Sequence, residues 1–190
     1  MGTCFTCGTK VNRKKSLKSL DTIHSNEKKT ASITSSINTD EEISKKHFKL
    51  DKSRILGIGG FGLVCHATKR TDADKNHQYA IKIVPKYEVL QRNGIAAVMN
   101  ELKALILLVD ELFICSVHYA FQDDRCVYLV LDLAKFGDLR ANLKLSPKNR
   151  FTEERARFYV CQILLALDSC HKKNILHRLS SSYLLLSLFK

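Results

Sequence analysis

A glycine-rich run at residues 57–62, Gly-Ile-Gly-Gly-Phe-Gly, is the feature that most restricts how this chain can fold. Because glycine has no Cβ, a backbone turn with the spacing G-x-G-x-x-G can lie directly against phosphate groups. The spacing alone is weak evidence for any one fold, since dinucleotide-binding folds also use it. Here the run continues with Leu63-Val64 and is followed downstream by Ala80-Ile81-Lys82, whose lysine supplies positive charge for phosphates.

Short apolar runs around these glycines predict an antiparallel sheet. Strands are expected at 48–56, 63–67 and 78–84, followed by a hairpin of two strands at 116–122 and 126–132. The period of two along a strand puts Ala80 and Lys82 on the same face, where a small residue leaves room for adenine. Between the third and fourth strands, apolar residues from Ile95 to Val109 recur at helical spacing, with Glu101 inside the pattern.

A second helix is expected after Thr152, which can cap the free backbone donors of the first turn. Glu153 and Glu154 suit the positive end of the helix dipole. Its expected apolar stripe consists of Ala156, Val160, Ile163, Leu167 and Cys170.

These motifs together resemble a protein kinase of the AGC serine/threonine group. The resemblance is carried by G-x-G-x-x-G-x-V, A-I-K, H-Y-A-F-Q-D at 118–123 and Y-L-V-L-D-L at 128–133. Arg92-Asn93 and Gly137-Asp138-Leu139-Arg140 suggest the YANK-like branch. The resemblance implies an α+β fold, namely a kinase N-lobe of five antiparallel strands and one long helix, with only the first helices of the C-lobe.

The resemblance also implies an ATP site and the roles of its residues. Lys82 would pair with Glu101, Leu131 would guard the pocket, Asp132 and Ala134 would offer hinge backbone to adenine, and Asp138 would face the ribose. The full set expected to bind ATP is Leu56, Gly57, Ile58, Gly59, Gly60, Phe61, Gly62, Leu63, Val64, Ala80, Lys82, Leu131, Asp132, Ala134 and Asp138.

The sequence departs from the kinase pattern at two places. Glu111-Leu112 stands where the family usually has His-Pro, which predicts a differently braced loop. His177-Arg178 matches the start of the catalytic loop, but Leu179 replaces the aspartate that accepts the substrate hydroxyl's proton. In register, Ser181, Ser182 and Leu184 replace the lysine, the proline and the metal-binding asparagine, and no D-F-G follows.

Magnesium is therefore expected for the family, but its protein ligands are missing here, and no metal site is predicted. Because the functional identities fail together after Arg178, we favour a truncated product over a natural short protein with altered function. Two functions remain open. One is the ATP-binding part of a serine/threonine kinase that is inactive in this form, and the other is a non-catalytic N-lobe module that binds nucleotide or a partner protein.

The amino terminus predicts a lipid anchor. Met1-Gly2-Thr3-Cys4-Phe5-Thr6 fits the pattern for myristoylation of Gly2, and Cys4 and Cys7 are candidates for palmitate. Because one myristoyl chain binds marginally, a second signal is needed. Attraction of a basic arm to an anionic membrane is a further candidate, and the arm consists of Lys10, Arg13, Lys14, Lys15 and Lys18.

The composition indicates the cellular compartment and argues against a zinc site and against a nucleic-acid-binding protein. There are seven cysteines, an odd number, and no secretory signal peptide, so reduced thiols and a cytoplasmic protein at the inner face of a membrane are expected. Zinc at Cys4 and Cys7 lacks a second ligand pair. The net charge of +12 does not indicate nucleic acid, because part of it is the local basic arm and no aromatic-interleaved basic surface is evident.

The expected organisation has five parts. These are a lipid-anchor and basic arm at 1–20, a flexible linker at 21–46 that is too polar to bury a core, the N-lobe at 47–134, the start of the C-lobe at 135–178 and a tail unlike kinases at 179–190.

Overall fold

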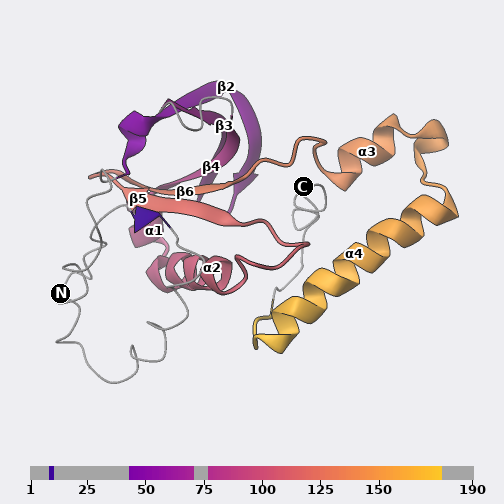
Figure 1. Cartoon of the computed structure of the whole chain (residues 1–190). Helices are drawn as coiled ribbons and strands as arrows, with labels where there is room; N and C mark the ends of the chain where they lie inside the picture. Colours follow the sequence, from indigo (N-terminus) through magenta and orange to yellow (C-terminus); the bar gives the residue numbers. More distant parts are fainter. Residues whose placement is uncertain (1–8, 11–42, 71–76, 177–190) are drawn as a thin grey trace.

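The computed structural model describes residues 9–10, 43–70 and 77–176. Gly2, Cys4, Cys7, His177 and Arg178 lie outside the described residues, as do the greater part of the expected linker and the whole tail. The described part consists of a strongly curved sheet with two helices below it, and a pair of helices that extends to one side (Figure 1).

The sheet is antiparallel throughout, with strand order β1-β5-β6-β4-β3-β2. The five expected strands are β2 (Phe48–Gly59), β3 (Gly62–Lys69), β4 (Gln78–Pro85), β5 (Val117–Gln122) and β6 (Cys126–Asp132). Register shifts in β2 between Asp51 and Ile55, and between Ile55 and Gly57, fit the bending of this long strand toward β3.

A sixth strand, β1 (Thr9–Lys10), was not expected. It falls within the arm predicted to contact a membrane, yet its backbone pairs with the edge strand β5, Thr9 opposite Ala120 and Lys10 opposite Tyr119. An edge strand presents unpaired backbone groups, and β1 covers part of this edge.

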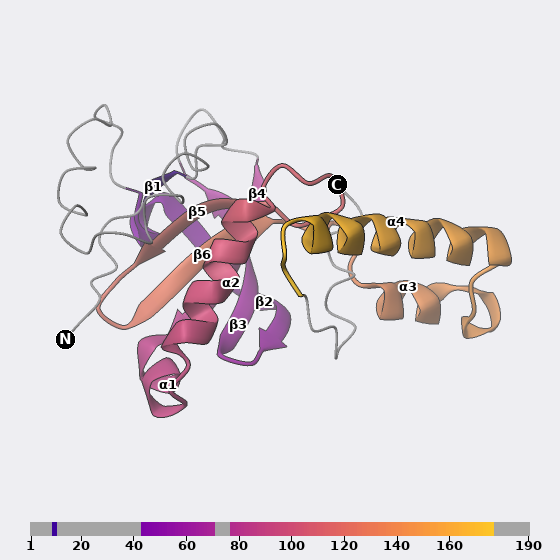
Figure 2. The ribbon, with the colours of Figure 1, turned by 90° about the horizontal axis from the view of Figure 1, so that it is seen from below.

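Two helices lie against one face of the sheet (Figure 2). The expected helix is α2 (Ile95–Leu107), and a short α1 (Lys86–Gln91) that the sequence did not predict precedes it. Val89 of α1 and Val98 of α2 pack with Val84, Val127 and Leu129 of the sheet. On the other face, a second core cluster fills the inside of the curve with Phe48, Ala67, Tyr79, Ile81, Tyr119, Phe121, Tyr128 and Val130. The helix α2 is therefore fixed on one side of the sheet.

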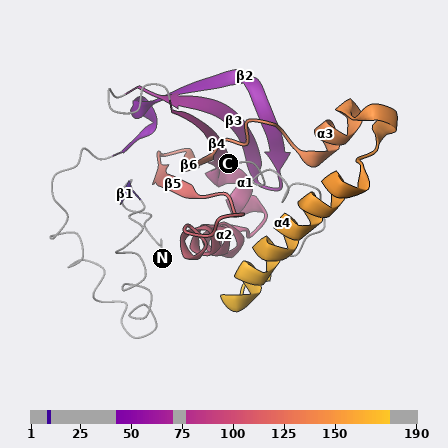
Figure 3. The same ribbon diagram turned by 45° about the vertical axis from the view of Figure 1, so that its right-hand side comes forward.

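The C-terminal part consists of α3 (Leu139–Leu145), a 3-10 turn at Pro147–Asn149 and α4 (Glu153–Lys172). Thr152 caps α4, as expected, by accepting a hydrogen bond from the Arg155 backbone N–H at 3.3 Å. Figure 3 shows α4 beside α3 and directed toward the α2 side of the sheet at its C-terminal end. Among the described residues, no helix is both long enough and apolar enough to cross a membrane.

The expected apolar stripe of α4 is wrong at one position. Val160 is 51% exposed, whereas the buried residues are Tyr159, Ala166 and Cys170. At this turn of α4 the buried residue is therefore Tyr159 rather than Val160, and Tyr159 packs edge-on against Phe151 just before the helix.

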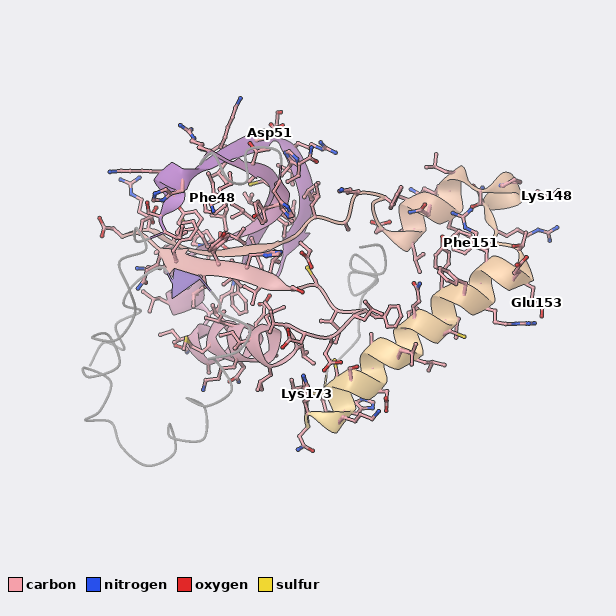
Figure 4. All side chains as sticks on the ribbon, in the orientation of Figure 1. Phe48, Asp51, Lys148, Phe151, Glu153 and Lys173 are labelled. Atoms are coloured by element: carbon pink, nitrogen blue, oxygen red, sulfur yellow. The ribbon has the colours of Figure 1, made fainter. Side chains whose placement is uncertain are left out.

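Glu111, at the place where the sequence departs from the family, is held by the end of α4. Lys173 Nζ lies 2.6 Å from Glu111 Oε1 and donates a second hydrogen bond of 2.7 Å to the carbonyl oxygen of Leu107 at the end of α2. Figure 4 shows Lys173 where α4 comes back toward the helix–sheet part. An ion pair thus braces this loop.

We expect Lys173→Met to lower the free energy of unfolding by roughly 1 kcal/mol at neutral pH, the upper end for partly exposed pairs. Hydrogen bonds from Lys173 and Ser169 hold the pKa of the Glu111 carboxyl below its ordinary value. This stabilisation is therefore complete at neutral pH and is lost as pH falls through that lowered pKa. Urea unfolding at neutral and acidic pH measures it. The control is Lys172→Met, whose partner Asp168 is solvent-exposed, and equal losses for the two variants would contradict the bracing role.

Candidate functional site

The glycine-rich run forms the turn between β2 and β3, with Gly59 opposite Gly62. A Cβ at Gly62 would lie 2.0 Å from the backbone oxygen of Ile83, so only glycine allows the hairpin to lie this close to β4. A Cβ at Gly59 would lie 3.5 Å from Cε and 3.9 Å from Nζ of Lys82. The hairpin therefore lies directly beside the end of the Lys82 side chain.

Lys82 and Glu101 meet across the interface of sheet and helix. Lys82 Nζ donates hydrogen bonds to both carboxylate oxygens of Glu101, at 2.5 Å and 2.7 Å. The Lys82 side chain is only 14% exposed, so its charge is largely removed from water and requires a counter-charge. β4 supplies the lysine and α2 supplies the glutamate.

Next to the ion pair, the sheet offers a small-residue position bordered by a leucine. Ala80 lies opposite Leu131 of β6 on one side and opposite His66 of β3 on the other. Val64 is the register partner of Lys82. Leu56 and Val64 are half-buried. These residues, expected to contact adenine, thus lie on adjacent strands. Ile58 is 74% exposed, and the structure does not bring its side chain into this group.

The polar groups at the end of β6 and after it make hydrogen bonds within the protein. The side chain of Asp132 is held by the start of β5 and the residue before it, because Oδ2 accepts from the Ser116 backbone N–H at 3.0 Å and Oδ1 lies 2.6 Å from His118 Nε2. The carbonyl of Ala134 accepts from Gly137 N–H at 3.3 Å. Asp138 is the N-cap of α3 and accepts from Ala141 N–H at 2.6 Å.

Sequence reasoning missed two residues that shape the site. His118 was noted only as part of a motif, and nothing in the sequence separates its contact with Asp132 from a surface role. Arg92 was noted only as a branch marker, yet its Nη1 donates a 2.7 Å hydrogen bond to the carbonyl of Gly60. The only signal for this contact in the sequence is that Arg92 is a basic residue shortly before α2, in a chain that also has a glycine-rich loop.

The arrangement fits a nucleotide phosphate group. A turn of glycines, which have no Cβ atoms, lies beside a lysine whose ammonium donates a hydrogen bond to a carboxylate. A surface with a small side chain lies next to it. Within residues 43–70 and 77–176, no three or more His, Cys, Asp or Glu side chains lie close enough together to form a group that could hold a metal ion.

The profile of the protein kinase domain matches residues 50–180. The chain belongs to the protein kinase family. Its relatives are serine/threonine kinases of the AGC group. It is 33% identical to mouse serine/threonine-protein kinase 32C over 138 residues, which are 73% of this chain and 27% of that protein. It is 35% identical to human ribosomal protein S6 kinase alpha-1 over 151 residues, 79% of this chain and 20% of the relative.

Human serine/threonine-protein kinase LATS2 is 37% identical over 138 residues, 70% of this chain and 12% of that protein. The chain thus spans about a quarter or less of the length of these relatives. The matched region includes most of β2, the strands β3 to β6, α2 and α4, but not β1.

Two matched glycine substitutions test the packing of the hairpin. Gly62→Ala places a Cβ against the Ile83 backbone, and we expect it to lower the free energy of unfolding by about 1–3 kcal/mol. Gly60→Ala meets no atom within 4 Å, and a change within about 0.5 kcal/mol is expected. Urea unfolding followed by circular dichroism measures both. If the two substitutions cost the same, the close approach of hairpin and β4 is incorrect.

Proposed function

We propose that residues 47–138 bind ATP and that the complete form of this protein is a serine/threonine kinase. The observation that carries the proposal is the pair of hydrogen bonds between Lys82 and Glu101 beside Gly59. In this place the ammonium of Lys82 contacts the phosphates, and the backbone of residues 57–62 covers them.

The proposal assigns the adenine to the surface formed by Leu56, Val64, Ala80 and Leu131. Its support is the register of β3, β4 and β6, which brings Val64, Ala80 and Leu131 to neighbouring positions. The backbone of Asp132 and Ala134 would bind the edge of the base. One carboxylate oxygen of Asp138 caps α3, so the ribose contact falls to the other oxygen.

We propose that this chain, as its sequence stands, transfers no phosphoryl group. ATP supplies the γ-phosphoryl, but the side chain of Leu179 has no oxygen that accepts a proton from the acceptor hydroxyl. The side chain of Leu184, in the register of the metal-binding asparagine, has no oxygen ligand for magnesium.

We also propose that the amino terminus attaches the protein to the anionic inner face of a membrane. Support comes from the pattern at Gly2, the neighbouring Cys4 and Cys7, and the basic arm. β1 begins at Thr9, two residues after Cys7. If the pairing with β5 persists in the anchored protein, this edge of the N-lobe lies close to the lipid.

One observation favours the non-catalytic binding module as the second candidate. The helix α4 exposes four large apolar side chains, Phe158, Val160, Leu164 and Leu165, each at least half exposed. Exposed apolar groups in such number on one helix are typical of surfaces that another protein segment covers.

Purified chain is expected to show no magnesium-dependent phosphoryl transfer to a generic serine/threonine peptide above the background of Lys82→Ala. The reason is the lack of a base at position 179. Incorporation of labelled phosphate from γ-labelled ATP measures the activity. Clear transfer that disappears in Lys82→Ala would contradict the proposed inactivity while supporting the ATP site.

Gly2→Ala is expected to move the protein from the membrane fraction of cells to the supernatant, because it removes the site of myristoylation. A chain with Gly8→Ala, outside the acylation position, serves as the control. Unchanged membrane association of Gly2→Ala would rule out the lipid anchor.

A further inference from the structure

The tip of the glycine-rich hairpin contacts the corner between α1 and α2. Arg92 Nη1 donates to the carbonyl of Gly60 at 2.7 Å. Next to it, the ring of Phe61 lies so close to Gly94 that a Cβ at that glycine would be 2.4 Å from Cε1 and 2.7 Å from Cζ. The proposed ATP site assigns no function to the corner Arg92-Asn93-Gly94.

The backbone of the corner is shaped for this contact. Asn93 has φ of 49°, in the left-handed region that asparagine tolerates better than most residues. Gly94 N–H then donates to the carbonyl of Val89 at 2.7 Å, and the Gly94 carbonyl accepts from Val98 N–H at 3.1 Å. Gly94 is thus the buried N-cap of α2, and its missing side chain provides the space that the Phe61 ring fills.

The same contacts connect the glycine-rich hairpin to α2, in addition to the connection through the Lys82–Glu101 ion pair. Phe61 packs against the core cluster between the sheet and the helices, which includes Val89 and Val98. The helix α2 carries Glu101, which binds Lys82, and Lys82 lies beside Gly59. The hairpin therefore contacts α2 directly through Gly94 and indirectly through the ion pair.

We propose that the corner Arg92-Asn93-Gly94 is a seat for the hairpin tip that couples the position of the glycine-rich hairpin to that of α2. In this account Phe61, Arg92 and Gly94 are positioning residues for the Lys82–Glu101 pair. The hydrogen bond from Arg92 is exposed to solvent, so the packing of Phe61 on Gly94 contributes more to the coupling. The consequence for nucleotide affinity rests on the proposed function, whereas the coupling itself exists without ligand.

Amide hydrogen exchange of the full chain without nucleotide tests the coupling. Gly94→Ala forces the Phe61 ring out, and exchange is expected to become about fivefold or more faster in both 57–63 and 95–101, the lower end of the effect of overpacking. In a Phe61→Leu background the same substitution meets no ring, so its additional effect is expected to be less than about twofold.

Two milder variants decide the question if Gly94→Ala does not fold. Phe61→Leu and Arg92→Ala leave the corner backbone intact and are expected to accelerate exchange in both segments, Arg92→Ala by about two- to fivefold. The charge-matched control is Lys103→Ala, at an exposed position of α2, with no change expected in the hairpin. Acceleration confined to one segment, or an undiminished effect of Gly94→Ala in the Phe61→Leu background, would overturn the proposal.

A titration with a fluorescent ATP analogue separates this inference from the proposed function. Because the coupling is lost, the Gly94→Ala variant is expected to bind the ATP analogue about fivefold or more weakly than the unsubstituted chain. If the unsubstituted chain binds no nucleotide, the proposed ATP site fails, and the exchange data still decide whether the hairpin and α2 are coupled. Equal affinity of Gly94→Ala and the unsubstituted chain, despite faster exchange, would remove the positioning role.

Discussion

The ion pair between Lys82 and Glu101 joins the sheet to α2, and the candidate site is arranged around it. A largely buried ammonium is costly unless a carboxylate accepts its hydrogen bonds. This requirement fixes the rotation of α2 so that Glu101 faces β4, while Val98 on the same helix packs into the core. The charge and the apolar packing thus specify one position for the helix.

Many of the elements of this arrangement could be predicted from the sequence. Short apolar runs located five strands, and period 3.6 located α2 with Glu101 on it. The glycine spacing indicated the hairpin, because the close approach of Gly62 to the Ile83 backbone excludes every other residue type. Local patterns of this kind reflect backbone sterics and one-sided burial, which a sequence records directly.

Contacts between elements could not be predicted in the same way. Phe61 packs on Gly94, which is 33 positions away in the sequence. Lys173 pairs with Glu111, which is 62 positions away. Nothing in the local pattern of either partner indicates the other. For Val160 the reason is local, because the apolar pattern of the helix does not show that Tyr159, which packs against Phe151, is the buried residue at this turn. The pairing of β1 with β5 depends likewise on an edge strand distant in the sequence.

Titration calorimetry with ATP tests the central claim that the Lys82–Glu101 pair forms a nucleotide site. The account predicts measurable binding by the unsubstituted chain, loss of binding in Lys82→Met and an affinity about tenfold weaker in Glu101→Gln, since the lysine then loses its charged partner. Glu88→Gln on α1 removes the same charge outside the site and should leave the affinity unchanged. If Glu101→Gln binds ATP as well as Glu88→Gln does, the ion pair does not position the lysine, and the account is contradicted.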